Sequence, residues 1–201
     1  MSIKLAIIYY SSTGTNYQLS KWAKEGAEEL GAEVRILKVP ELAPQKAIDS
    51  NPAWKAHAEA TKDVPEATLE DLEWADAYIF STPTRYGSVA SQMRQFFDTT
   101  GGLWSAGKLA NKAVSAMSSA QHSHGGQEAT ILGLYTIMYH WGAIVVAPGF
   151  TDQAVYQGGG NPYGTSVSVD QKGEMQEDVE AAVKHQAKRT VTVAEWIKKG
   201  S

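Results

Sequence analysis

The chain has 201 residues, of which 43% are hydrophobic and 20% charged, a composition typical of one globular domain. Its formal net charge of -4 argues against nucleic acid as a partner, because proteins that bind phosphate backbones carry a surplus of positive charge. The absence of cysteine excludes disulfides, thiol nucleophiles and thiolate metal ligands. Together with the lack of a signal-peptide pattern at the N-terminus, it leads us to expect a cytoplasmic protein.

Apolar runs and helical periodicities alternate along the chain. They predict strands at residues 3–10, 33–39, 77–81, 112–118 and 143–146, and helices at residues 16–30, 68–74, 91–98, 126–139 and 176–198. Residues 40–68 are predicted to form a long surface excursion with a short helix around Trp54. The alternation predicts an α/β fold, a doubly wound five-stranded parallel sheet flanked by helices, in a single domain over residues 1–201.

Residues 129–151 contain no Asp, Glu, Lys or Arg and are long enough to span a bilayer. However, His140, two glycines and Pro148 interrupt the segment, and basic flanks are absent. A buried helix followed by a buried strand explains it better, so we expect no membrane span.

Ligands of parallel α/β sheets bind at the carboxyl ends of the strands, which directs attention to residues 11–16, 83–90, 119–126 and 148–165. The first of these loops joins a predicted strand to a predicted helix and consists of Ser11, Ser12, Thr13, Gly14, Thr15 and Asn16. Helix N-termini attract anions, and hydroxyls nearby can bind phosphate oxygens. The loop lacks the lysine of a Walker motif and the three glycines of a Rossmann motif. It therefore predicts a monophosphate held without a cationic side chain; the alternative is that the hydroxyls only cap the helix.

The second loop places Arg85 and Tyr86 between Pro83 and Gly87. A guanidinium and an aromatic ring there could meet a planar ligand, although a surface arginine and a rim tyrosine would explain the spacing equally. In the third loop, His122 and His124 lack a nearby carboxylate, so we expect no metal site. Its backbone amides could instead bind the polar edge of a ring system.

Several short stretches, in this order and together, resemble the WrbA family of flavodoxin-like NAD(P)H:quinone oxidoreductases. They are YYS (9–11), SSTGTN (11–16), TPTRYG (82–87), QMR (92–94), DTTGGLW (98–104), HGGQE (124–128) and PYG (162–164). The similarity covers nearly the whole chain, and it implies that the expected sheet is flavodoxin-like.

The resemblance implies non-covalently bound FMN, with its phosphate on residues 11–16. The ring would lie between Thr84, Arg85, Tyr86 and Gly87 on one side and Ser119, Ala120, Gln121, His122, Ser123, His124 and Gly125 on the other. His140 matches a family histidine near the flavin, Trp104 matches the aromatic residue of the quinone pocket, and Thr13 matches a position associated with the nicotinamide cofactor. Without the resemblance, Trp104 and His140 are typical of core residues.

The implied reaction is ping-pong: NADH or NADPH reduces FMN, and a quinone then takes two electrons at the same face. The resemblance also implies a homotetramer whose active sites are completed by neighbouring subunits. Two other classes stay open at this point. One is a flavodoxin-type one-electron carrier, although such carriers are usually shorter and more acidic; the other is a flavin-binding interaction protein.

Overall fold

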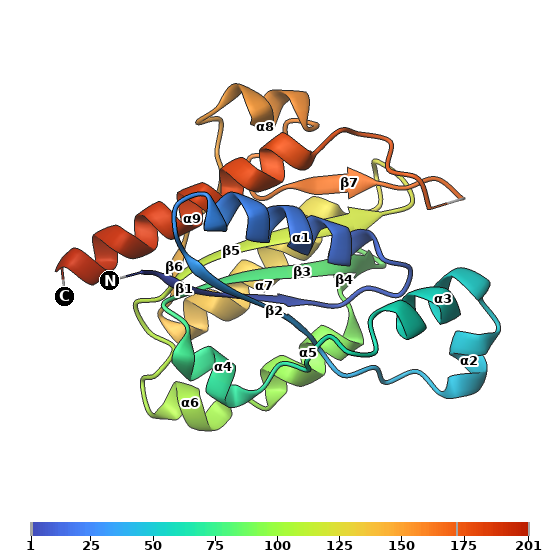
Figure 1. The fold of residues 1–201 in the computed structure, drawn as a ribbon, viewed down its shortest axis with the longest axis horizontal. Helices are drawn as coiled ribbons and strands as arrows, with labels where there is room; N and C mark the ends of the chain where they lie inside the picture. Colours follow the sequence, from blue (N-terminus) through green and yellow to red (C-terminus); the bar gives the residue numbers. More distant parts are fainter. Residues whose placement is uncertain (1, 172, 201) are drawn as a thin grey trace.

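A parallel sheet runs through the centre of the molecule, with helices on both of its faces (Figure 1). The computed structural model describes residues 2–171 and 173–200. Five strands pair in parallel in the order β2 (Glu33–Lys38), β1 (Lys4–Tyr9), β3 (Ala77–Arg85), β5 (Ala113–Ala120) and β6 (Ile144–Val145). This is the strand order of the flavodoxin-like fold, so the predicted fold class is confirmed.

Two further strands extend the sheet to seven among the described residues. β4 (Ser88–Val89) pairs antiparallel with the end of β3, and β7 (Ser166–Ser168) pairs in parallel with the end of β5. β3 therefore continues to Arg85, past its predicted end at Ser81. Pro83 is tolerated in β3 because the pairing with β1 ends at Ser81, which leaves the proline unneeded as a donor on that side.

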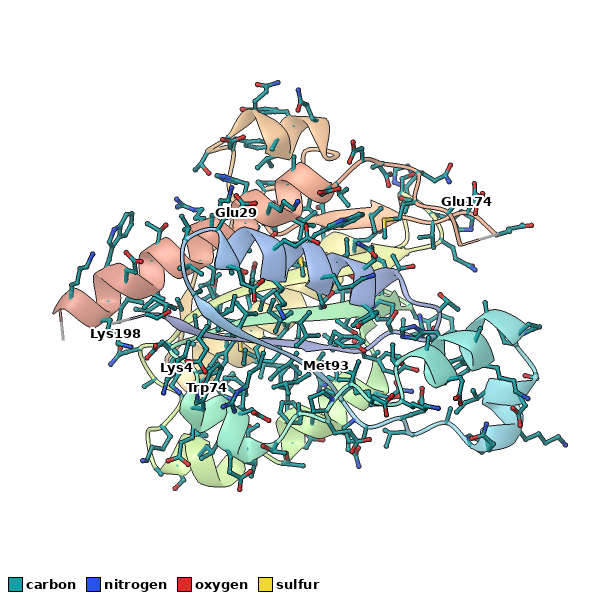
Figure 2. All side chains as sticks on the ribbon, in the orientation of Figure 1. Lys4, Glu29, Trp74, Met93, Glu174 and Lys198 are labelled. Atoms are coloured by element: carbon teal, nitrogen blue, oxygen red, sulfur yellow. The ribbon has the colours of Figure 1, made fainter. Side chains whose placement is uncertain are left out.

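Successive residues of the central strands point to opposite faces of the sheet, and both faces are covered. On one face, Leu5 and Ile7 pack with α1 (Thr15–Glu28) and α9 (Glu180–Gly200). On the other face, Ala6 and Ile8 pack with α4 (Leu69–Trp74), α5 (Ser91–Asp98) and α7 (Gln127–Trp141). Figure 2 shows the side chains that fill these layers, including Met93 of α5, which is fully buried.

The long excursion between β2 and β3 contains α2 (Gln45–Asp49) and α3 (Pro52–Ala60), the second being the helix predicted around Trp54. Three short helices were not predicted, α2, α6 (Gly101–Ser105) and α8 (Gln153–Gln157). The last helix begins at Glu180 and not at residue 176. The reason is that Met175 forms a β-bridge with Val169 and Gln176 N donates to Ser168 O at 2.9 Å, which holds these residues beside β7 and out of the helix.

The uncharged segment 129–151 forms most of α7 together with β6. Among residues 2–171 and 173–200, we find no helix with the length and apolar character needed to cross a bilayer.

Candidate functional site

A cleft of about 710 Å³ opens at the carboxyl edge of the sheet, where β1, β3 and β5 end. Its volume lies within the usual range of small-molecule and cofactor sites. Three predicted loops meet there. Their residues in the cleft wall are Ser11, Ser12, Thr13, Thr15, Asn16, Pro83, Thr84, Arg85, Tyr86, Ser119, Ala120, Gln121, His122 and Gly125. Gly14, Gly87, Ser123 and His124 belong to the same loops but do not line the cleft, whereas Trp104 and His140 lie elsewhere.

The first loop leaves the N-terminus of α1 open to an anion. Gly14 takes the N-cap position with φ of 102°, no side chain caps the helix, and no acidic residue lies in its first turn. The Ser11 hydroxyl accepts a hydrogen bond from Gly14 N at 3.0 Å and so shapes the loop. The structure therefore contradicts the alternative that these hydroxyls only cap α1. Free N–H groups and a partial positive charge fit a bound phosphate.

The side chain of Asn16 makes its hydrogen bonds within the protein. It is 1% exposed, and its Oδ1 accepts a hydrogen bond from Ser119 Oγ at 2.6 Å. Its Nδ2 donates to Ser81 Oγ at 3.1 Å. The side chain thus joins the start of α1 to the ends of β3 and β5. What Asn16 can offer a phosphate is its backbone N–H.

Arg85 brings a positive charge to the first loop. Its guanidinium donates to Ser12 Oγ at 3.3 Å and to Thr84 O at 3.2 Å. That a phosphate is held there without a cationic side chain stays a prediction, but the structure places the Arg85 guanidinium beside the loop. The loop itself has no cationic side chain, but Arg85 at the end of β3, 73 residues further along the chain than Ser12, lies beside it.

The turn between β3 and β4 presents Tyr86 to solvent at the cleft. Arg85 pairs with Ser88, so the turn has two central residues, Tyr86 with φ of 54° and Gly87 with φ of 76°. Two left-handed residues are typical of the type I′ hairpin turn, and a left-handed tyrosine is uncommon. The turn holds Tyr86 fully exposed in the cleft wall, where an aromatic ring can meet a planar ligand.

The third loop is held by its backbone. The carbonyl oxygen of His122 accepts hydrogen bonds from Gly125 N at 2.9 Å and from Gln127 Nε2 at 3.0 Å. The side chains of residues 121–124 are exposed, and among them Gln121 and His122 line the cleft. The loop is thus fixed in position while its polar groups remain accessible to a ligand.

Trp104 and His140 meet each other, but away from the cleft. Trp104 Nε1 donates to the carbonyl oxygen of His140 at 2.8 Å. α7 has 15 residues, begins just after the third loop and has His140 in its last turn. At 1.5 Å per residue, about 20 Å separates His140 from the cleft. In Figure 1, α6 accordingly lies on the side of the molecule opposite to α3. Both side chains are exposed, so neither is a core residue.

Two parts of the cleft wall were not predicted from the sequence. Asn51 and Ala53 come from the start of α3, and residues 169–171 with Gly173 come from the turn after β7. The Asn51-Pro52 pair is a recognisable helix start, and Asn51 Oδ1 does accept hydrogen bonds from Ala53 N and Trp54 N. No sequence signal shows that either segment folds over the cleft.

Comparison with known proteins now identifies the class. The family model described as NADPH-dependent FMN reductase matches residues 3–154. The chain belongs to this family, and both the family and the fold indicate a flavin cofactor. A protein named NAD(P)H dehydrogenase (quinone) from Deinococcus radiodurans is 56% identical over 189 residues, which cover 94% of each chain. A protein of the same name from Geotalea daltonii is 37% identical, covering 96% of this chain and 97% of its own.

Solved structures give the same fold at low sequence identity. A flavodoxin, WrbA-like protein from Agrobacterium tumefaciens aligns over 100% of both chains with a TM-score of 0.62 and 17% identity. A flavodoxin from the domain Archaea aligns over 98% of this chain and 99% of its own, with a TM-score of 0.57 and 16% identity. The predicted family resemblance is confirmed by these relatives and by the family model.

Proposed function

We propose that this protein is an FMN-dependent NAD(P)H:quinone oxidoreductase. The observation that carries the proposal is the cleft at the carboxyl edge of the sheet, in which an uncapped helix N-terminus faces the loops that hold Arg85 and Tyr86. The name of the Deinococcus radiodurans relative, NAD(P)H dehydrogenase (quinone), supports the choice of substrates.

The residues of the cleft fit FMN. The first-turn N–H groups of α1 and the hydroxyls of Ser12, Thr13 and Thr15 would hold the phosphate, and the guanidinium of Arg85 would balance its charge. The ring would lie between residues 84–87 and 119–125. When bound, FMN supplies hydride and two-electron chemistry between NAD(P)H and a quinone.

The protein's own task is to bind and orient, because this chemistry requires no side-chain nucleophile. Tyr86 would cover the ring site with an aromatic face, and Arg85 would add a planar cation beside it. Thr13 is exposed at the cleft rim, where it would meet the nicotinamide cofactor. The two substrates would then use the same face of the flavin in turn, which is a ping-pong order.

We further propose that Trp104 and His140 reach a flavin site only in a homotetramer, from a neighbouring copy of the chain. Within one chain they lie about 20 Å from the cleft along α7, which rules out a direct contact there. The exposed apolar surface around them supports an interface: Trp104 is 55% exposed, Tyr139 65% and Ile144 40%. Light scattering coupled to gel filtration tests the assembly, and a monomer at micromolar concentration would contradict it.

Two broader expectations remain proposals. We propose a single domain over residues 1–201, since α9 closes the chain back onto α1 through Lys188–Glu29 at 2.6 Å and Lys184–Glu25 at 2.9 Å. We also propose a cytoplasmic location, which the absence of cysteine supports. Limited proteolysis that leaves a stable half of the chain would contradict the single domain.

The function is tested by purifying the protein with FMN and following NADH and NADPH oxidation with and without benzoquinone. We expect flavin absorbance and quinone-dependent oxidation. Flavin-loaded protein without quinone-dependent turnover would remove the enzyme proposal. Potentiometry separates the alternative: reduction in two well-resolved one-electron steps would favour a flavodoxin-type carrier.

A further inference from the structure

The second and third loops touch each other at two glycines. Gly126 is the N-cap of α7 with φ of 90°, and a Cβ built on it would lie 2.6 Å from Gly87 Cα. Backbone therefore meets backbone where the two cleft walls come together. Because glycine has no side chain to hold this contact, other contacts must fix the relative position of the two walls.

Those contacts converge on the hydroxyl of Thr84. Its Oγ1 accepts a hydrogen bond from Gly87 N at 3.1 Å, inside the second loop. It lies 3.3 Å from the carbonyl oxygen of Gly125 in the third loop. It also lies 2.8 Å from Thr130 Oγ1 in the first turn of α7. One hydroxyl thus joins both walls to the helix behind them.

Counting protons gives the direction of these bonds, because each hydroxyl has a single proton to donate. Thr130 Oγ1 has two acceptors within reach, Thr84 Oγ1 at 2.8 Å and the carbonyl oxygen of Gly126 at 3.0 Å. The Gly126 oxygen already accepts Thr130 N at 3.0 Å. The arrangement that gives every group a partner has Thr130 donating to Thr84 and Thr84 donating to Gly125 O.

We infer that Thr130 is a positioning residue that fixes the two walls of the cleft through Thr84. Thr130 is fully buried and does not line the cleft, so it acts on a ligand only through the loops it holds. The Thr84 hydroxyl is committed to this chain of bonds and is not available to the flavin ring. Only the naming of FMN as the ligand rests on the proposed function.

The first test needs no cofactor. Thr130→Val removes the hydroxyl at nearly constant volume, so Thr84 loses a donor and the walls loosen. We expect the amide hydrogen of Gly87 to exchange about tenfold faster in the cofactor-free variant, the factor that corresponds to one lost hydrogen bond. Thr130→Ser keeps the hydroxyl and should restore the wild-type exchange rate. Unchanged Gly87 exchange in Thr130→Val would overturn the inference.

The second test is FMN binding, followed by quenching of flavin fluorescence and by the absorption spectrum of the bound flavin. Thr130→Val should raise the Kd for FMN about tenfold and shift the spectrum, and Thr130→Ser should do neither. Thr84→Val should act like Thr130→Val, and the double variant should be no worse than either single one, because all three break the same chain of bonds. Additive effects would overturn the inference, and Thr130→Ala, which also removes the hydroxyl, takes the place of Thr130→Val if that variant does not fold.

Thr190 offers a matched control on the other face of the sheet. It is also fully buried, and its Oγ1 lies 2.9 Å from Ser115 Oγ and 2.8 Å from the carbonyl oxygen of Gln186. Thr190→Val loses the same chemistry away from the cleft. It should lower stability similarly but leave Gly87 exchange and the Kd for FMN unchanged, and equal effects from both variants would overturn the inference. If the wild type binds no FMN, the proposed function fails, while Gly87 exchange still decides the role of Thr130.

Discussion

The two ends of helix α7 differ in how many contacts each makes with the rest of its own chain. At its N-terminal end, Gly126 lies in close backbone contact with Gly87 of the second loop, and Thr130 Oγ1 lies 2.8 Å from Thr84 Oγ1. At its C-terminal end, His140 and Trp104 share one hydrogen bond and otherwise face solvent. At one end the cleft wall is assembled from a single chain, whereas the other end presents exposed aromatic surface that is typical of an interface.

The residues that the sequence predicted around one flavin therefore fall into two groups. The first group is the residues that line the cleft together with Gly126 and Thr130, which hold its walls. Substitutions in this group should change cofactor binding in any assembly state. The second group is Trp104 and His140, which we propose act on the site of a neighbouring subunit. Substitutions of Trp104 should therefore change turnover and not cofactor binding. The following predictions test that division.

The largest effect is expected from Gly126→Ala at the cleft end. The new methyl group would overlap Gly87 Cα at 2.6 Å, and the residue would keep a left-handed backbone. We expect a loss of about 1–3 kcal/mol in the free energy of unfolding and a more than tenfold weaker Kd for FMN. Urea denaturation and FMN titration measure both quantities.

Gly133→Ala is the matched control on the same helix, because a Cβ there would meet nothing within 4 Å. It should stabilise the protein by about 0.5–1 kcal/mol, since alanine is the better helix former, and leave FMN binding unchanged. Equal losses of stability and of FMN affinity in both variants would contradict the prediction, because they would show that the effect is not specific to the contact between Gly126 and Gly87.

The second effect concerns the other end of α7. Trp104→Ala should lower kcat/KM for the quinone about tenfold while the Kd for FMN stays the same, as for a buried aromatic residue at the centre of an interface. Steady-state kinetics at saturating FMN, with gel filtration of the same sample, provides the measurement. A large change in FMN affinity with the assembly intact would contradict the division.

A smaller effect is expected from Ser12→Ala in the first loop. The variant loses a hydroxyl that contacts the Arg85 guanidinium and would contact the phosphate. We expect a Kd for FMN raised about fivefold, the range of one hydrogen bond, with kcat unchanged once FMN is saturating. Ser50→Ala, which removes an exposed hydroxyl bonded to Ala47 O on α2, is the control and should leave the Kd as it was.

The smallest effect is a pH dependence at the cleft end. Burial lowers the pKa of His57 below its ordinary 6.5, and the charge of Lys38 lowers it further. The His57 ring lies beside the first loop, with Nδ1 3.5 Å from a Cβ built on Gly14. Because the unfolded chain binds the proton more readily, stability should fall as the pH drops from about 7 through and below 6.5.

His57→Gln should weaken this dependence but not abolish it, since burial also lowers the pKa of His185. Urea denaturation at pH 7 and at pH 5 measures the change for each variant. An identical pH dependence in His57→Gln and wild type would show that His57 is protonated equally well in the folded and unfolded chain.

Much of the cleft could be predicted from local sequence. Residues 11–16 connect an apolar strand to an amphipathic helix, and the observed Gly14 turn leaves that helix uncapped as a phosphate site requires. The alternating elements predicted that the central strands are parallel, and therefore the edge of the sheet at which the loops meet. The ends of some elements could not be predicted from local sequence. β3 continues through Pro83 and α9 begins later than predicted, because segments distant in sequence pair with the residues at these ends.

The class of fold, the loop proposed to hold the phosphate and the family resemblance could be read from the sequence alone, because they depend on residues that are neighbours along the chain. Only the tertiary structure decided that Arg85 reaches Ser12 across 73 residues and that Thr130 reaches Thr84 across 46. It also separated His140 and Trp104 from the cleft, since a helix places its two ends on opposite edges of the sheet. Such contacts follow from strand order and helix length, and no local pattern of residues encodes them.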